Sequence, residues 1–86
     1  MIQQIHEKLF RTKDLYLASF LILYSHLTPS FEKKDGKIIF SFPSTDELYR
    51  GLQDFNNGEV IDASEYAAAI KRLRAEMIQK KMETEK

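Results

Sequence analysis

The residues that could support chemistry are few and widely spaced in this chain of 86 residues. The histidines are His6 and His26, and neither lies at a spacing typical of a metal site. Ser44 and Glu47 form a polar pair that could suggest acid–base work, but their spacing is that of a helix cap, in which the two residues satisfy each other's backbone amides. The three glycines are not grouped into a phosphate-binding loop. We therefore expect no catalytic group, no metal, no cofactor and no small-molecule substrate.

Residues 33–48, KKDGKIIFSFPSTDEL, are the most function-like segment of the chain. Asp35-Gly36 predicts a tight two-residue turn with positive φ at both positions. Counting outward from this turn pairs Phe31 with Phe40, and the alternation of a strand groups four apolar side chains on one face: Phe31, Ile38, Phe40 and Phe42. Such rings could stack on nucleic-acid bases, but a lone hairpin is marginal in water and needs an apolar face to bury. We interpret the phenylalanines as core.

A helix is predicted over residues 13–26, with Thr12 as its N-cap. It is unusual because apolar side chains occur on nearly all of its sides, beyond the single stripe of an ordinary amphipathic helix. Either other elements cover it on several sides or part of its surface meets another chain. The candidate protein interface consists of Tyr16, Ile22 and Leu23, and the occupant could be a second copy in a homodimer or another protein.

Two further helices are expected, one after Ser44 and one after Asp62, each introduced by a capping pattern. The last helix carries a group of basic residues that could contact nucleic-acid phosphates: Lys71, Arg72 and Arg74. The same residues also fit a solvated helix face.

The composition limits the partners that we expect. Thirteen basic and thirteen acidic residues balance, whereas a dedicated DNA-binding protein is usually strongly basic. The charges are unevenly placed, since residues 44–62 contain five acidic residues and one arginine. The chain contains no cysteine, shows no signal peptide, and has no apolar run long enough to cross a bilayer, so we expect a cytoplasmic protein without a membrane partner.

These elements predict the α+β class: an apolar N-terminal helix, a two-stranded antiparallel hairpin, and two C-terminal helices. Residues 1–11 fit either a helical stripe containing Ile2 and Ile5 or a third short strand near residues 8–11. We expect a single globular domain over residues 12–82 and a frayed tail over residues 83–86.

Three stretches also resemble a small family of bacterial and bacteriophage proteins that is known as a domain of unknown function. They are TKDLYLA at residues 12–18, DGKIIFSF at residues 35–42, and DFNNG at residues 54–58 followed by residues 62–69. The resemblance covers residues 12 to about 78 and leaves residues 1–11 outside. It implies a phage or mobile-element setting and supplies no catalytic residues.

The interpretation that we favour is a small non-catalytic protein-interaction module, acting as a phage or mobile-element accessory protein. The alternative is a weak nucleic-acid-binding protein that uses the basic face of the last helix.

Overall fold

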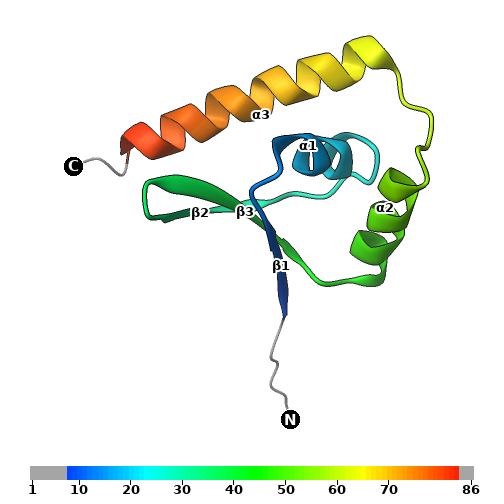
Figure 1. The fold of residues 1–86 in the computed structure, drawn as a ribbon, viewed down its shortest axis with the longest axis horizontal. Coiled ribbons are helices and arrows are strands. Elements are labelled where there is room, and N and C mark those ends of the chain that lie inside the picture. Colours follow the sequence, from blue (N-terminus) through cyan, green and yellow to red (C-terminus); the bar gives the residue numbers. More distant parts are fainter. Residues whose placement is uncertain (1–7, 84–86) are drawn as a thin grey trace.

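The computed structural model describes residues 8–83 and has an α+β architecture (Figure 1). Its elements follow the order β1 (Leu9–Thr12), α1 (Leu15–Leu23), β2 (Ser30–Lys34), β3 (Lys37–Pro43), α2 (Asp46–Asn56) and α3 (Ala63–Glu83). The predicted α+β class is confirmed, although a strand precedes the helix that was expected to come first. The predicted stripe at Ile2 and Ile5 and the last three residues of the predicted tail lie outside the described part of the chain.

The three strands form one antiparallel sheet in the order β1-β3-β2. Asp35 and Gly36 have φ values of 54° and 77°, as a type I′ turn requires, and Phe31 pairs with Phe40 in the expected register. The alternation of side chains then buries Phe40 and Phe42 completely on the inner face. The hairpin is thus specified by its turn and by the burial of its aromatic face.

The segment that fitted either a helix or a strand forms strand β1 over Leu9–Thr12. It pairs with β3 from Leu9 opposite Pro43 to Thr12 opposite Phe40. The Ser44 amide extends this ladder by donating to the Lys8 carbonyl at 3.0 Å. The sequence allowed either a helix or a strand in this segment, and pairing with the buried central strand β3 selected the strand.

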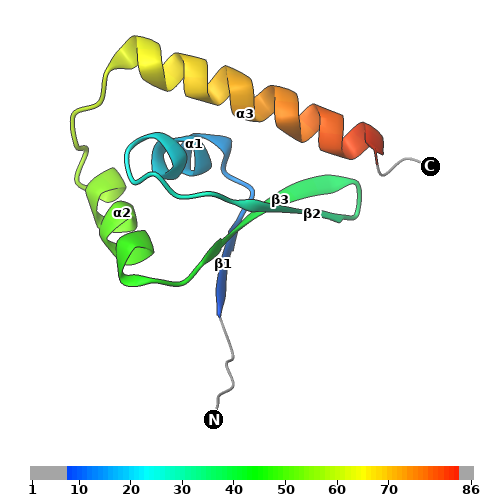
Figure 2. The same cartoon turned by 180° about the vertical axis from the view of Figure 1, so that it is seen from behind.

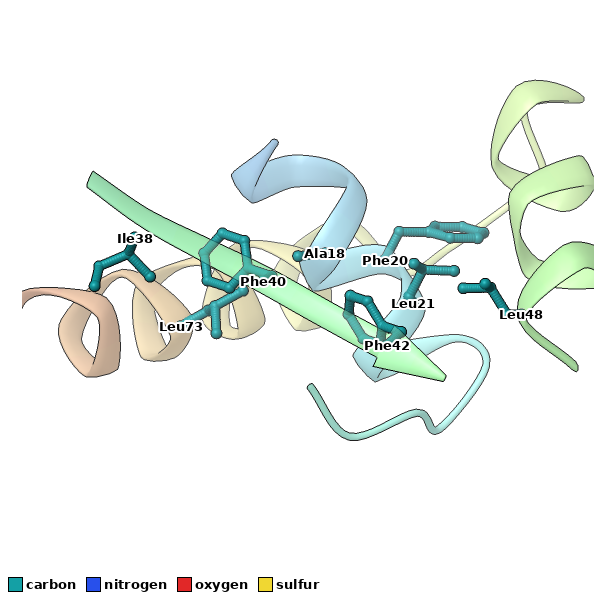
Figure 3. Close-up of a cluster of buried hydrophobic side chains, with 8 residues drawn as sticks. All are labelled: Ala18, Phe20, Leu21, Ile38, Phe40, Phe42, Leu48 and Leu73. Carbon is teal, nitrogen blue, oxygen red and sulfur yellow. The ribbon is translucent and has the colours of Figure 1, made fainter. Parts of the chain in front are cut away.

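Helix α1 lies at the centre of the molecule, with α3 on one side, the sheet on another and α2 at a third (Figures 1 and 2). The core joins side chains from four of the six elements: Ala18, Phe20 and Leu21 of α1, Ile38, Phe40 and Phe42 of β3, Leu48 of α2 and Leu73 of α3 (Figure 3). This central position explains why α1 is apolar on nearly all of its sides.

The limits of α1 differ from the prediction. Asp14 is the N-cap instead of Thr12, because its carboxylate accepts hydrogen bonds from the amides of Tyr16 and Leu17 at 2.9 and 3.1 Å. The Thr12 hydroxyl accepts from the Asp14 amide at 3.0 Å and so supports the cap from two residues before it. At the other end His26 takes a φ of 57°, and the Leu27 amide donates back to the Leu21 carbonyl at 3.1 Å. This is the left-handed helix ending in which glycine is usual.

Helix α2 begins one residue later than predicted. Thr45 is its N-cap, and its hydroxyl accepts from the Leu48 amide at 3.2 Å. The predicted cap, Ser44, is still tied to the sheet through its amide, so the helical conformation starts after it.

Helix α2 packs very closely on α1 at Gly51. A Cβ atom on Gly51 would lie 2.6 Å from the Ser25 hydroxyl oxygen and 2.7 Å from a methyl group of Leu21. The close contact between the helices, and not the backbone conformation, therefore favours glycine at this position.

Helix α3 is introduced by Asp62, as predicted: its carboxylate accepts from the Glu65 amide at 2.9 Å and from the Ser64 hydroxyl at 2.8 Å. These hydrogen bonds, led by that of the Glu65 amide, lower the pKa of Asp62. Ala69 and Leu73 are the buried residues of α3, which runs across α1 and reaches the hairpin with its C-terminal half (Figure 1).

Candidate functional site

The residues that could have supported catalysis are occupied with local structure. Asp62 caps α3, and Ser44 continues the sheet ladder through its backbone amide. Among residues 8–83, no group of three or more potential metal ligands gathers in one place. The surface features that stand out in the described part are instead two charged hollows and one apolar groove.

The apolar groove lies along one flank of α3. Two hollows of about 200 and 400 Å³ lie next to each other, with Thr28, Pro29 and Glu76 lining both, and we call them together the α3 groove. Its apolar half is lined by Ile22, Leu27, Pro29, Ala69 and Leu73. Its other half is lined by Phe31 and by polar residues of α3: Glu76, Gln79, Lys80 and Glu83. The lining on α3 spans residues 69–83, which corresponds to about 21 Å of helix.

The α3 groove adjoins an edge of the sheet. Phe31 belongs to β2 and Pro29 directly precedes this strand, which is an outer strand of the sheet. Lys34 and Lys37 flank the two-residue turn and form a hydrogen-bonded pair, and such pairs alternate along the ladder. The backbone N–H and C=O of Phe31 therefore point away from β3, toward the outer edge. The Lys80 ammonium lies over the Phe31 ring, 5.7 Å from the ring centre.

The three residues of the predicted α1 interface do not share one surface. Tyr16 is 54% exposed, and its carbonyl accepts a hydrogen bond from the Tyr66 hydroxyl at 2.8 Å. Ile22 is half-buried, packs against the core and lines the α3 groove. Leu23 is also half-buried and follows Tyr16 by seven residues, which places it on the same side of the helix. Because three elements of its own chain cover α1, it has less apolar surface left for a partner than we expected.

The basic residues predicted to contact nucleic acid are also divided. Lys71, Arg72 and Arg74 are all exposed. Lys71 and Arg74 are three residues apart and lie on one side of α3, whereas Arg72 lines the α3 groove on another side. The three side chains therefore do not form one phosphate-binding cluster.

A different group of basic residues does converge, at the hairpin. Lys13, Lys34 and Lys37 line a hollow of about 290 Å³ together with Asp35 and Ile39. We call it the lysine hollow. The sequence carried no signal that Lys13, twenty-one residues before Lys34, would lie beside the lysines of the hairpin turn. The connection from β1 to α1 brings Lys13 there.

A second charged hollow, of about 170 Å³, lies between the end of α1 and α2, and we call it the acidic hollow. It is lined by Tyr24, Ser25, Glu47, Arg50, Gly51 and Asp54. The pKa of Tyr24 is raised by burial and, next, by the negative charges of Glu59 and Asp54. Glu59 therefore lies close to this acidic hollow as well.

The outer face of the sheet carries a small polar network. Glu32 accepts hydrogen bonds from the Ser41 hydroxyl at 2.6 Å and from the Arg11 guanidinium at 3.1 Å. The Ser41 hydrogen bond and, next, the Arg11 hydrogen bond lower the pKa of Glu32. The network joins all three strands, and we assign it a structural role.

None of the helices within residues 8–83 combines the length and the apolar character needed to cross a membrane. Comparison with curated proteins and with solved structures gave no match. One family matches residues 7–79, starting five residues earlier than the resemblance noted in the sequence. With nearly the whole domain covered, the chain belongs to that family, Domain of unknown function (DUF5659).

Proposed function

We propose that the protein is a small non-catalytic interaction module that holds an extended segment of a partner protein in the α3 groove. The observation that supports this proposal is the position of the groove, between a long helix and the outer edge of strand β2. An extended peptide that adds to a sheet edge gains backbone hydrogen bonds for affinity, and neighbouring apolar pockets select its side chains.

The two parts of the site have separate roles in this proposal. The outward N–H and C=O of Phe31 bind the backbone of the segment. The apolar half of the groove, with Ile22, Leu27 and Leu73, receives one of its apolar side chains. Arg72 and Glu76 carry opposite charges at the rim, so the groove as a whole does not select for one sign of charge. We therefore expect the occupant to be an apolar, extended segment. A cytoplasmic location and a phage or mobile-element origin belong to the same proposal and come from the sequence.

A blocked groove tests this proposal. Thr28 is exposed and lines both halves of the α3 groove, so Thr28→Trp should fill the groove without disturbing the core. Gln53→Trp, at an exposed position of α2, is the matched control. A library of displayed random peptides is selected on the wild-type protein, and the enriched peptides are then measured against all three proteins.

The enriched peptides should bind the wild type and Gln53→Trp equally and bind Thr28→Trp at least about tenfold more weakly, the effect of losing one well-filled apolar pocket. When a peptide pairs with the edge of a sheet, only every second residue of the peptide forms backbone hydrogen bonds to the strand. N-methylation of those residues should therefore weaken binding. If no peptide family is enriched, or if the peptides bind Thr28→Trp as well as the wild type, the proposal is wrong.

A further inference from the structure

The charges of the chain are separated between two ends of the molecule. The hairpin turn lies at one end of the long axis and α2 at the other (Figures 1 and 2), and this axis measures 42 Å. Residues 44–62, which form α2 and the loop after it, contain five acidic residues and one arginine. The hairpin end contains the lysine hollow, in which three lysines accompany one aspartate. Acidic and basic groups are therefore concentrated at different ends of a protein with no net charge.

The basic end is built from three separate segments. Lys13 comes from the β1–α1 connection, and Lys34 and Lys37 flank the hairpin turn. The last turn of α3, which contains Lys80 and Lys81, lies on the other face of the hairpin, where the Lys33 ammonium donates to the Lys81 carbonyl at 3.4 Å. The three lysines line the hollow together with the half-buried side chain of Ile39, so the surface combines positive charge with an apolar group.

The acidic end has the complementary composition. Its negative charges come from Asp46, Glu47, Asp54, Glu59 and Asp62. Large apolar side chains are exposed among them, with Tyr49 at 55% and Val60 at 89%. This end therefore offers an acidic surface with protruding apolar groups.

We infer that the lysine hollow binds the acidic α2 end of a second copy of this chain. Opposite charges at complementary surfaces attract and orient the partners, and the apolar groups at both ends are covered in the contact. In this inference the contact is head-to-tail, between two different surfaces at opposite ends of the molecule, and each pair keeps one free surface of each kind. Such contacts continue into open chains or close into rings, so the assembly extends beyond a dimer. Like the proposed function, this inference has a protein as the partner. The lysine hollow and the acidic end are, however, separate surfaces from the α3 groove.

The first measurement is the mass of the full chain by light scattering and sedimentation. Protein concentrations from roughly 10 μM to roughly 1 mM cover weak association. Salt is set at about 0.01 M and about 1 M, where the screening length is about 30 Å and about 3 Å. At low salt the average mass should rise with concentration past that of a dimer, and at high salt it should return to that of the monomer.

Charge reversal identifies the surfaces. One variant reverses the hollow with Lys13→Glu, Lys34→Glu and Lys37→Glu. A second reverses the acidic end with Glu47→Lys, Asp54→Lys and Glu59→Lys. Each variant alone should associate at least about tenfold more weakly than the wild type, because like charges now face each other. An equimolar mixture of the two should associate again, since each supplies the surface that the other lacks.

The matched control makes the same change in net charge elsewhere, with Lys71→Glu, Arg72→Glu and Arg74→Glu on α3. It should weaken association less than reversal of the hollow does, and thermal melting should show that all variants fold. A wild type that stays monomeric at low salt would overturn the inference, as would a mixture that fails to restore association. If the wild type is monomeric and binds a single-stranded DNA oligonucleotide that the reversed hollow does not bind, the lysine hollow is a nucleic-acid surface instead. Groove-blocked Thr28→Trp should associate normally, which separates this result from a failure of the proposed function.

Discussion

Replacing Gly51 with alanine should destabilise the protein, although local helix propensity predicts the opposite. Gly51 lies in the middle of α2, where alanine is favoured over glycine by about 1 kcal/mol in the free energy of helix formation. The new Cβ would however lie 2.6 Å from the Ser25 hydroxyl oxygen and 2.7 Å from a Leu21 methyl group. The sign of the change therefore depends on whether these neighbours can move.

The Ser25 hydroxyl can rotate away, because its side chain is only half-buried. Leu21 cannot, because it is completely buried in the core between α1 and α2. Overpacking of a filled core costs about 1–3 kcal/mol. After the propensity gain is subtracted, we expect Gly51→Ala to lower the free energy of unfolding by about 1 kcal/mol, which corresponds to about 4–8 °C in Tm for a domain of this size.

Urea denaturation and thermal melting of Gly51→Ala measure the effect. Gln53→Ala, at an exposed site of the same helix, is the control and should stay within about 0.5 kcal/mol of the wild type. Leu21→Val removes the buried methyl group that the Cβ would meet, so the double variant should lose less stability than the two single variants together. A Gly51→Ala protein that is more stable than the wild type would refute the close approach of α2 to α1.

Five other substitutions test the fold, and one of them is compared across pH. Phe40→Ala should lower the free energy of unfolding by about 3–5 kcal/mol in denaturation, because Phe40 is completely buried, and wild-type stability would exclude it from the core. Thr45→Ala should lower the free energy of unfolding by about 0.5–2 kcal/mol, and Ser44→Ala should lower it by less than about 0.5 kcal/mol. A larger loss of stability for Ser44→Ala than for Thr45→Ala in melting experiments would show that Ser44 is the cap. His26→Gly should raise the unfolding free energy by about 1 kcal/mol because glycine adopts positive φ without strain; a lower Tm would contradict the left-handed ending. The folded-state pKa of Asp62 is lowered, so its stabilising effect is complete above the unfolded pKa of about 3.9 and is lost as the pH falls through the folded pKa. The stability difference between the wild type and Asp62→Ala should therefore be present at neutral pH and disappear in acid, and a difference independent of pH would argue against the cap.

The elements that could be predicted from the sequence are those decided by local chemistry. Asp35-Gly36 determines a turn with positive φ at both residues, and the turn in turn determines which strand residues pair. The alternation of side chains then predicts that Phe40 and Phe42 face the core. Asp62 could be recognised as a cap because the capping interaction extends over only three residues.

Tertiary structure decided the features in which two local solutions have similar free energies or in which distant segments meet. Residues 8–11 fitted a helix or a strand until β3 provided a partner for Leu9–Thr12. Ser44 and Thr45 are both good caps, and the hydrogen bond of the Ser44 amide to Lys8 selected the later residue. Helical spacing alone could have predicted that Arg72 lies on a different side of α3 from Lys71 and Arg74. It could not have predicted the groove beside Arg72.

The reason is the range of the interactions involved. Caps, turns and helix phase depend on neighbours within a few residues, so their signals lie in contiguous sequence. The α3 groove, the lysine hollow and the close contact at Gly51 each join segments that are more than ten residues apart in the chain. Which segments meet is decided by how the apolar faces of α1, α3 and the sheet are buried together, and that packing exists only in the folded chain.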